Sequence, residues 1–218
     1  MILQKRLFIM LEAGIIQQLR GIFSTLAHHI TFRATLATGR PENADLRAFL
    51  EDVAAVSDHI DCTFEEAQTQ QSLFSILLDG QETGIRFRGI PNGHEFTSLL
   101  LAVLNADGQG KNLPDESTAR RIKALQGPVR LTTYVSLTCT NCPDVVQALN
   151  VMALLNPAIE HEMVDGALYQ EEVDKLAIQG VPAVYLDGKL LHSGRGNLGE
   201  LLEKLSETVG EAEDADAQ

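Results

Sequence analysis

Two cysteines separated by two residues constrain the fold of this chain most strongly. They lie in the segment Cys139-Thr140-Asn141-Cys142-Pro143, which follows an apolar run typical of a β-strand, residues 129–137. Apolar residues that share one face of a helix come directly after the pair: Val145, Val146, Leu149, Met152 and Leu155. The sequence therefore predicts that a strand leads into the cysteine pair and that a helix leaves it.

About forty residues later, the segment Gly180-Val181-Pro182-Ala183-Val184 predicts another strand, entered through a Val-Pro step. Strand, CxxC, helix and a later Val-Pro strand are together typical of a thioredoxin-like redox site. In that pattern the proline is cis and packs against the disulfide, at a cost of only about 0.5–1 kcal/mol over trans. Pro182 alone indicates an ordinary strand-entry proline, but with the CxxC the redox interpretation is favoured.

The order of the two cysteines suggests their roles in dithiol–disulfide exchange. The attacking species is a thiolate, and a free cysteine with a pKa near ~8.5 is mostly protonated at neutral pH. The unpaired N–H groups and positive dipole of a helix N-terminus favour the charged form. We therefore expect Cys139, at the exposed start, to attack, and Cys142, one turn in, to resolve. Pro143 suits the first helical turn, where its missing N–H costs nothing.

The alternative use of a CxxC is half of a zinc site. A structural zinc needs four ligands, commonly two CxxC pairs or one pair with two histidines. Cys62 is the only other cysteine, and the six histidines do not form a His-x3–5-His pair. We therefore expect no bound metal, and we interpret Cys62 as a small core residue.

Composition narrows the partners and the compartment. The 218-residue chain carries a net charge of −13 and no tryptophan, which argues against a nucleic-acid or anionic-membrane surface. The apolar run that follows Lys5-Arg6 ends at Glu12, too early for a signal peptide or a membrane span. Three cysteines are too few for a disulfide-stapled secreted scaffold. We expect the protein in the cytoplasm.

An internal repeat divides the chain into two α/β units. Ala34 to Thr38 parallels Tyr134 to Thr138, an offset of 100, and Leu78-Asp79-Gly80 parallels Leu186-Asp187-Gly188, an offset of 108. We predict two tandem thioredoxin-like folds, of which only the second carries a CxxC. The predicted parts are an N-terminal extension (1–9), a redox-silent fold (10–106), a linker (107–114), the CxxC fold (115–209) and an acidic disordered tail (210–218).

The helices and strands expected in each unit follow from hydrophobic periodicity. In the first unit we predict helices over 11–27, 43–57 and 93–105 and strands over 29–37, 60–65, 73–79 and 85–89. In the second unit we predict helices over 115–126, 141–155, 169–178 and 197–208 and strands over 129–137, 159–164, 182–187 and 189–193. The sequence leaves open whether the two units share one sheet or pack as separate lobes.

The chain resembles the N-terminal region of the flavoprotein subunit of bacterial alkyl hydroperoxide reductase, which begins with two fused thioredoxin folds. The resemblance covers roughly residues 10–208. It is carried by Gly93-His94-Glu95-Phe96-Thr97-Ser98-Leu99, by residues 138–150 around the CxxC, by Leu155-Asn156-Pro157, and by Gly180-Val181-Pro182-Ala183-Val184. A CxxC alone is generic, but its extension to Cys-Pro-Asp-Val-Val-Gln-Ala-Leu-Asn together with Gly-His-Glu-Phe-Thr-Ser is specific.

The resemblance implies an electron relay. In that family the region takes electrons from a flavin-containing disulfide centre, itself reduced by NADH, and passes them to the disulfide of a two-cysteine peroxiredoxin. Cys139 would attack the peroxiredoxin disulfide and Cys142 would resolve the mixed disulfide, with Thr140, Asn141, Pro143, Val181 and Pro182 supporting the site. Glu95 matches a family carboxylate near the CxxC, and it would exchange a proton with a thiol if burial raises its pKa. A helix first-turn carboxylate is the equal alternative for Glu95.

Two departures from the family pattern limit what the resemblance carries over. Thr140 stands where the family commonly has histidine, so the reduction potential does not transfer. No Gly-x-Gly-x-x-Gly follows a strand, so we expect this chain to bind no cofactor itself. FAD and NADH would act through a flavoprotein disulfide reductase, either in a missing C-terminal region or as a separate partner. We leave open whether the chain is an excised region or a complete gene product.

Two other functions stay open at the sequence level. The first is a free-standing glutaredoxin-like or protein disulfide oxidoreductase-like enzyme, which direct reduction by glutathione would favour. Tandem enzymes of that kind usually keep a CxxC in both halves, whereas the first unit here reads Thr38-Gly39-Arg40-Pro41. The second is a non-catalytic docking module, for which Cys139→Ser would leave every function intact.

Overall fold

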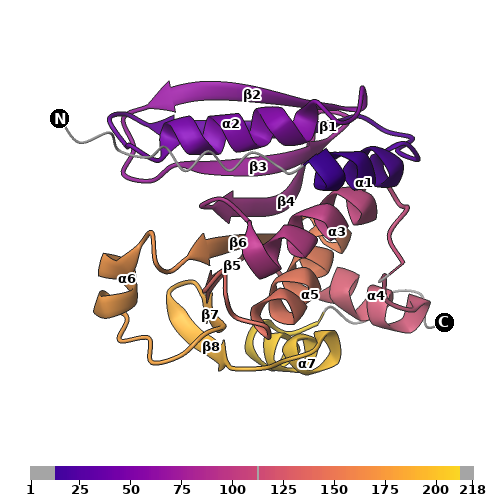
Figure 1. Cartoon of the computed structure of the whole chain (residues 1–218). Coiled ribbons are helices and arrows are strands. Elements are labelled where there is room, and N and C mark those ends of the chain that lie inside the picture. The colour runs from indigo at the N-terminus through magenta and orange to yellow at the C-terminus, as the bar shows by residue number, and fades with distance from the viewer. Residues whose placement is uncertain (1–12, 112, 212–218) are drawn as a thin grey trace.

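A single eight-stranded sheet runs through the whole molecule (Figure 1). The computed structural model describes residues 13–111 and 113–211. Strands follow one another across the sheet in the order β2-β1-β3-β4-β6-β5-β7-β8. The first four positions and the last four repeat the same pattern, because each half has its first two strands parallel and its last two as an antiparallel hairpin.

The first unit contains three helices, a 3₁₀ turn and four strands. In chain order these are α1 (Ala13–Phe23), β1 (Ile30–Ala37), α2 (Asn43–Ala54), β2 (Ile60–Ala67), β3 (Leu73–Leu78), β4 (Gln81–Arg88), η1 (Gly93–Glu95) and α3 (Phe96–Ala106). The predicted helix over 11–27 ends earlier, at Phe23, and its first two residues lie outside the described part of the chain.

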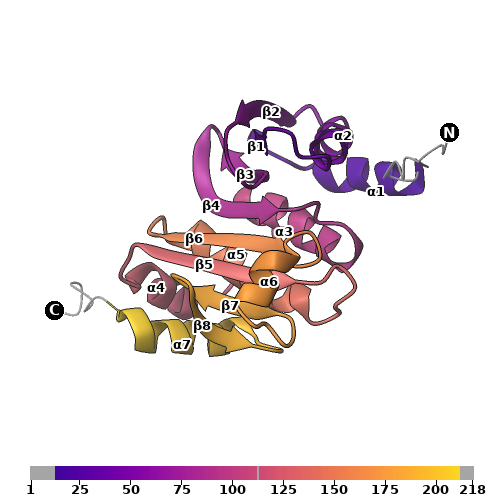
Figure 2. The same ribbon diagram turned by 90° about the vertical axis from the view of Figure 1, so that its left-hand side faces the viewer.

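The second unit repeats this order and adds one short helix. Its elements are α4 (Glu116–Ala124), β5 (Val129–Val135), α5 (Cys142–Leu155), β6 (Ile159–Asp165), α6 (Gln170–Lys175), β7 (Ala183–Leu186), β8 (Lys189–Ser193) and α7 (Leu198–Val209). Helix α6 lies on one face of the sheet, and α4 and α5 lie behind it (Figure 2). The two tandem thioredoxin-like folds predicted from the repeat are confirmed.

The turn that closes each hairpin shows how closely the repeat is kept. Asp79 and Asp187 have positive φ angles of 48° and 46°, and Gly80 and Gly188 that follow them both have φ of 80°. Two successive positive φ values define the tight turn that matches the twist of a β-hairpin, and Asp-Gly is a preferred sequence for it. The Leu-Asp-Gly echo in the sequence is therefore a repeated turn.

Strands β4 and β6 join the two units. They pair in parallel, with Ile85 opposite His161 and Arg88 opposite Val164. Figure 2 shows the strands of the two units stacked across this line. The units therefore share one sheet, which the sequence alone left open.

Buried side chains cross the same line. The core cluster contains Phe74 and Phe87 of the first unit, whose rings stack at 5.1 Å, and it continues through Met163 and Leu149 of the second unit. Helix α3 of the first unit packs against α5 of the second. Such burial excludes water from both helices, so the described residues form one continuous core.

Arg88 ties the two units on the other face of the sheet. Its guanidinium contacts Glu162 on β6 at 3.0 Å and Glu172 on α6 at 2.6 Å. Tyr134 donates its hydroxyl to the same Glu172 at 2.8 Å, and the Arg88 side chain is only 5% exposed. We name Arg88, Glu162, Glu172 and Tyr134 the junction cluster.

Four predicted boundaries differ from the observed ones. Strand β4 begins at Gln81 rather than 85, and α6 covers only 170–175 of the predicted 169–178, because Ala177 takes a positive φ of 51°. The predicted helix over 93–105 starts as the 3₁₀ turn η1. Glu211, expected in the disordered tail, accepts a hydrogen bond from Arg121 at 2.9 Å. The predicted extension over 1–9 and the predicted tail beyond 211 lie outside the described residues.

Candidate active site

Cys139 and Cys142 form a disulfide where β5 leads into α5. Cys142 is the first residue of α5 and is fully buried, whereas Cys139 is partly buried in the preceding loop. This corrects the expected placement in detail, because Cys139 lies three residues ahead of the helix and Cys142 opens it. The difference in exposure still separates one reachable sulfur from one shielded sulfur.

The residues around the pair shape the start of α5. Pro143 lies in the first helical turn and is buried, so its missing N–H leaves no helical hydrogen bond unmade. Asp144 follows in the same turn and is exposed. Thr140 is exposed and Asn141 partly buried, and the Asn141 side chain makes no capping hydrogen bond. The helix N-terminus therefore faces the disulfide with its own backbone N–H groups.

Val181 and Pro182 close the site from β7. The peptide bond between them is cis, as the thioredoxin-like pattern predicts. The carbonyl oxygen of Val181 lies 3.8 Å from the Cys139 sulfur. Pro182 is buried directly before β7, whose antiparallel partner is β5, so sheet pairing brings two distant segments to the same sulfur.

Glu95 enters this region from the first unit. Its side chain is fully buried, and the Ser98 hydroxyl donates to Oε2 at 2.6 Å. Its other oxygen, Oε1, has no hydrogen-bond partner among the described residues. Burial raises the pKa of Glu95 to about 7, although the Ser98 hydrogen bond opposes the shift. Such a carboxyl can both hold and release a proton near neutral pH.

Contacts across the unit interface place Glu95 beside α5. Turn η1, which contains Glu95, contacts α5, and the Gln147 amide of α5 lies 3.4 Å from the Ser98 hydroxyl. His94 is exposed, and its backbone N–H donates to the Leu137 carbonyl of the CxxC loop at 3.0 Å. The turn of the first unit thus holds the loop that carries Cys139.

Gly93 makes that hold possible. Its φ is +56°, and a Cβ at this position would lie 2.5 Å from the Leu137 carbonyl oxygen. Gly93 belongs to the sequence segment that carries the family resemblance, but nothing in that segment indicates this contact. Close approach of two backbones leaves no pattern in sequence except the glycine itself.

A buried polar network under α5 was missed at the sequence level. His161 on β6 is fully buried between Asn150 of α5, 2.7 Å from its Nδ1, and Thr133 of β5, 2.8 Å from its Nε2. The Asn150 Oδ1 can only accept, so Nδ1–H donates to it and Nε2 accepts from the Thr133 hydroxyl. Burial lowers the pKa of His161 to about 3, so the ring is neutral and holds α5 against the sheet.

Metal binding and membrane spanning find no support in residues 13–111 and 113–211. No three His, Cys, Asp or Glu side chains there are grouped as metal ligands would be. Cys62 is partly buried on β2, and burial raises the pKa of its thiol. Among the same residues no helix has both the length and the apolar character to cross a bilayer.

Comparisons with known proteins match both the sequence and the fold. A family model described as a thioredoxin domain matches residues 130–207, which include both cysteines of the pair. The alkyl hydroperoxide reductase protein AhpF of Staphylococcus epidermidis is 42% identical over 204 residues, which cover 94% of this chain and 39% of the relative. The chain thus spans about two fifths of the curated relatives' length.

Two solved structures share the whole arrangement. The crystal structure of the NTD_N/C domain of alkylhydroperoxide reductase AhpF from Enterococcus faecalis superposes with a TM-score of 0.80 at 33% identity, covering 88% of this chain and 98% of that one. A protein disulfide oxidoreductase from Aeropyrum pernix also gives a TM-score of 0.80, over 92% of this chain and 94% of that one. Its identity is 18%, so it shares the fold alone.

Proposed function

Because this chain belongs to the family of the N-terminal domain of the alkyl hydroperoxide reductase AhpF, we propose that it relays electrons by thiol–disulfide exchange. The acceptor is the disulfide of a two-cysteine peroxiredoxin, and the donor is an NADH-dependent flavoprotein disulfide reductase centre. The observation that carries the proposal is the pair itself, one reachable and one buried sulfur between a helix N-terminus and a cis proline. The compartment is the cytoplasm, where cysteines of this kind cycle rather than staple a fold.

The exchange proceeds in two balanced steps. The Cys139 thiolate attacks one sulfur of the peroxiredoxin disulfide, a mixed disulfide forms, and the other peroxiredoxin sulfur leaves as a thiolate. The Cys142 thiolate then attacks the Cys139 sulfur, which releases the second peroxiredoxin thiolate. The peroxiredoxin gains two electrons, and the Cys139–Cys142 disulfide is restored.

The donor returns two electrons to that disulfide. The homologues extend well beyond the part that matches this chain, which is 39% of their own length. FAD and NADH act in that remaining part or on a separate partner, since this sequence has no dinucleotide fingerprint after a strand. The redox-active group of this chain is its own disulfide.

Thr140, Asn141, Pro143, Val181 and Pro182 form the rim and floor on which the partner sulfur is presented. Glu95 accepts the proton of the Cys142 thiol as that sulfur attacks, and returns it when the dithiol is regenerated. Its pKa of about 7, set by burial, lies where a proton acceptor is most effective at neutral pH. The first unit thus contributes to the chemistry although it carries no redox-active pair.

Trapping the mixed disulfide tests this function. Cys142→Ser removes the resolving sulfur, so a partner attacked by Cys139 stays attached. The reduced variant is mixed with an oxidised two-cysteine peroxiredoxin, and a one-to-one adduct through Cys139 is expected by mass spectrometry. Cys62→Ser in the same background is the matched control and should trap equally well. Absence of an adduct while Cys139 is reduced and alkylatable would contradict the relay, and rapid reduction of the pair by glutathione alone would favour a free-standing oxidoreductase.

A further inference from the structure

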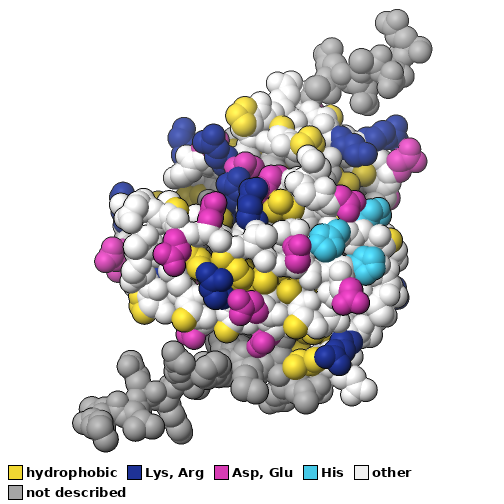
Figure 3. Space-filling view, turned by 90° about the horizontal axis from the view of Figure 1, so that it is seen from above, with side chains coloured by type: hydrophobic (Ala, Val, Ile, Leu, Met, Phe, Trp, Pro, Cys, Tyr) yellow, Lys and Arg dark blue, Asp and Glu magenta, His cyan; other side chains and the backbone are white. Residues whose placement is uncertain are grey.

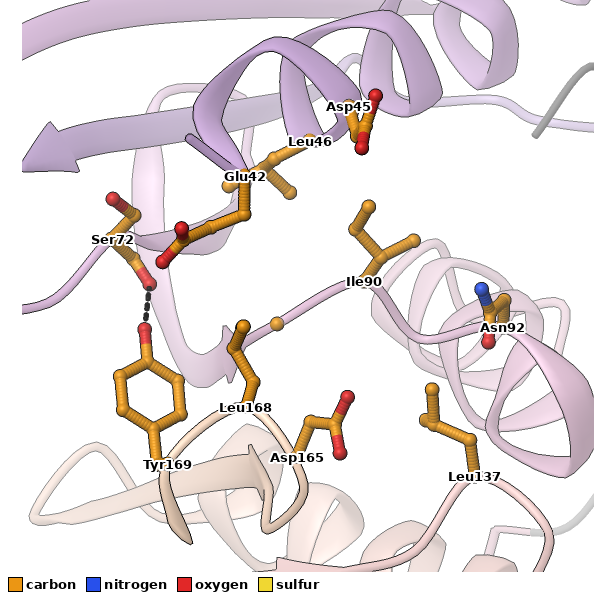
Figure 4. A pocket seen from close by; sticks show the side chains of 11 residues that line it. Glu42, Asp45, Leu46, Ser72, Ile90, Asn92, Leu137, Asp165, Leu168 and Tyr169 are labelled. Atoms are coloured by element: carbon orange, nitrogen blue, oxygen red, sulfur yellow. Dashed lines mark hydrogen bonds between the residues drawn. The ribbon is translucent and has the colours of Figure 1, made fainter. Parts of the chain in front are cut away.

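A cavity of about 150 Å³ opens between the two units at the end of the sheet that carries the CxxC loop. Figure 4 shows its lining, which comes from both units. Its apolar wall is formed by Leu46 and Ile90 of the first unit and by Leu137, Leu168 and the Tyr169 ring of the second. Tyr169 donates its hydroxyl to the Ser72 carbonyl at 3.1 Å, so the units touch at its rim.

Carboxylates also line this cavity. Asp45 of α2 and Asp165 at the end of β6 approach it from opposite sides (Figure 4). Asp165 is 9% exposed, accepts a backbone hydrogen bond from Ala167 at 3.1 Å, and has its pKa raised by burial. Among the described residues neither aspartate has an ion-pair partner, whereas Glu42, the third carboxylate, pairs with Arg40.

The first unit contributes its own sulfur-free active-site end to the cavity. Ser72 directly precedes β3, as Pro182 precedes β7, and Asn43 opens α2, as Cys142 opens α5. The Ser72 hydroxyl donates to the Asn43 side-chain oxygen at 2.6 Å and accepts from the Ala37 backbone at 2.9 Å. Hydrogen bonds thus fill the place where the second unit has its disulfide and cis proline.

The cavity lies within reach of the redox pair. Leu137, which lines it, is two residues before Cys139, and two extended residues span about 7 Å. A polypeptide that presents a disulfide to Cys139 can therefore place a side chain a few residues from its own cysteine in the cavity. Long basic side chains suit this lining, because their stems pack on apolar surface while their charged ends meet carboxylates.

We propose that this cavity binds a lysine or arginine side chain of the polypeptide whose disulfide Cys139 attacks. This specificity site rests on the proposed exchange function and deepens it. The stem lies against Leu46 and Ile90, and the cation lies between Asp45 and Asp165. The redox-silent unit then serves substrate recognition, since it supplies half of the site.

Two matched peptides test the site. Each carries one cysteine in a mixed disulfide with 2-nitro-5-thiobenzoate, and they differ only in a Lys or a Gln three residues from that cysteine. The full chain, reduced and freed of reductant, converts each peptide disulfide to thiols while forming its own disulfide, and released nitrothiobenzoate reports the rate. Versions with Ser in place of Cys and a fluorescent label measure binding without any redox step.

The expected preference is about two- to five-fold for the Lys peptide at low salt, the range of partly exposed charge pairs. It should fall to about one in Asp45→Asn and in the double variant with Asp165→Asn, and should persist in Asp52→Asn, which removes the same charge two turns further along α2. Salt should weaken it. Equal binding of the two peptides by the wild-type chain, or a preference that survives both variants, overturns the proposal. Failure to reduce either peptide contradicts the exchange function instead, and the binding arm still decides the cavity.

Discussion

At the residue scale, burial assigns different roles to two sulfurs that are only three positions apart. Cys139 is partly exposed beside the Val181 carbonyl, and Cys142 is fully covered at the start of α5. A partner disulfide can reach only the first of them. The sequence predicted this order from helix geometry, and the structure agrees although Cys142, rather than Cys139, opens the helix.

Alkylation of the reduced chain should follow the same order. Iodoacetamide reacts with exposed thiolates, so Cys139 should be modified well before Cys142, with partly buried Cys62 also slow. The raised pKa of Cys62 adds to its protection. Peptide mapping after timed quenching measures the three rates, and faster modification of Cys142 than of Cys139 would reverse the proposed roles.

Glu95 predicts a pH-dependent stability. Its pKa is about 7 in the folded chain against 4.5 for the free group, so the folded state holds a proton that the unfolded state has released. Stability from this group is therefore fully present below pH 4.5 and is lost as pH rises through 7. A shift of this size corresponds to about 3 kcal/mol.

Chemical denaturation of the oxidised chain at several pH values measures that loss. Glu95→Gln should remove most of the decline between pH 5 and 8, since the amide does not ionise. Ser98→Ala is the matched control, because it removes the hydrogen bond to Oε2 and keeps the carboxyl. Identical pH slopes for wild type and Glu95→Gln would show that Glu95 is not held protonated.

At the element scale, the turn η1 of the first unit supports the CxxC loop of the second. Gly93 allows the backbone contact with the Leu137 carbonyl, and His94 donates to the same oxygen. Below α5, the neutral His161 links that helix to β5 and β6. The position of the cysteine pair thus depends on elements from both units.

Gly93→Ala should be more destabilising than an ordinary alanine at positive φ. A Cβ in the left-handed region costs about 1–2 kcal/mol, and the clash with the Leu137 carbonyl adds to it. Gly80→Ala is the matched control, because Gly80 has φ of +80° and open space around its Cβ position. Denaturation of both variants should show a larger loss for Gly93→Ala, together with slower trapping by Cys139. Equal losses would mean that the loop contact is dispensable.

At the scale of the whole molecule, the units share one sheet, one core and the junction cluster. Arg88 pairs with Glu162 and Glu172 across the line where β4 meets β6. On the first-unit face seen in Figure 3, acidic and basic side chains are interspersed and the histidines gather on one side. Two histidines of this unit pair with aspartates, His28 with Asp107 and His29 with Asp61.

Arg88→Met should therefore destabilise the whole chain rather than one half. Removing one partner of a largely buried ion pair costs about 3–5 kcal/mol, because the remaining carboxylates lose their counter-charge. Arg33→Met is the control, since Arg33 and Glu82 are 48% and 41% exposed and such pairs contribute about 0–1 kcal/mol. A single unfolding transition that shifts by this amount is expected by circular dichroism and fluorescence. Two separate transitions would contradict the shared core.

Hydrophobic periodicity and turn residues predicted nearly every helix and strand, because each repeats a local pattern. The pairing of β4 with β6 was not predictable in this way. Ile85 and Phe87 alternate inward just as they would on an edge strand facing solvent on its other side. His161 was only an isolated histidine in the sequence, since its partners Thr133 and Asn150 come from other elements.

The cavity could not be foreseen for the same reason. Asp45 and Asp165 come together only when the two units dock, and neither belongs to a motif. The boundaries proposed for the domains, 10–106 and 115–209 with a linker between them, remain a proposal from sequence. The shared sheet shows that the two folds depend on each other across that linker.

The most direct test of the relay is a count of thiols after one turnover. The reduced chain, freed of reductant, is mixed with an equal amount of oxidised two-cysteine peroxiredoxin, and intact masses are read after alkylation. We expect one new Cys139–Cys142 disulfide for each peroxiredoxin disulfide lost, with Cys62 still a free thiol and no transfer in Cys139→Ser. A peroxiredoxin that stays oxidised while Cys139 remains a free and accessible thiol would contradict the relay.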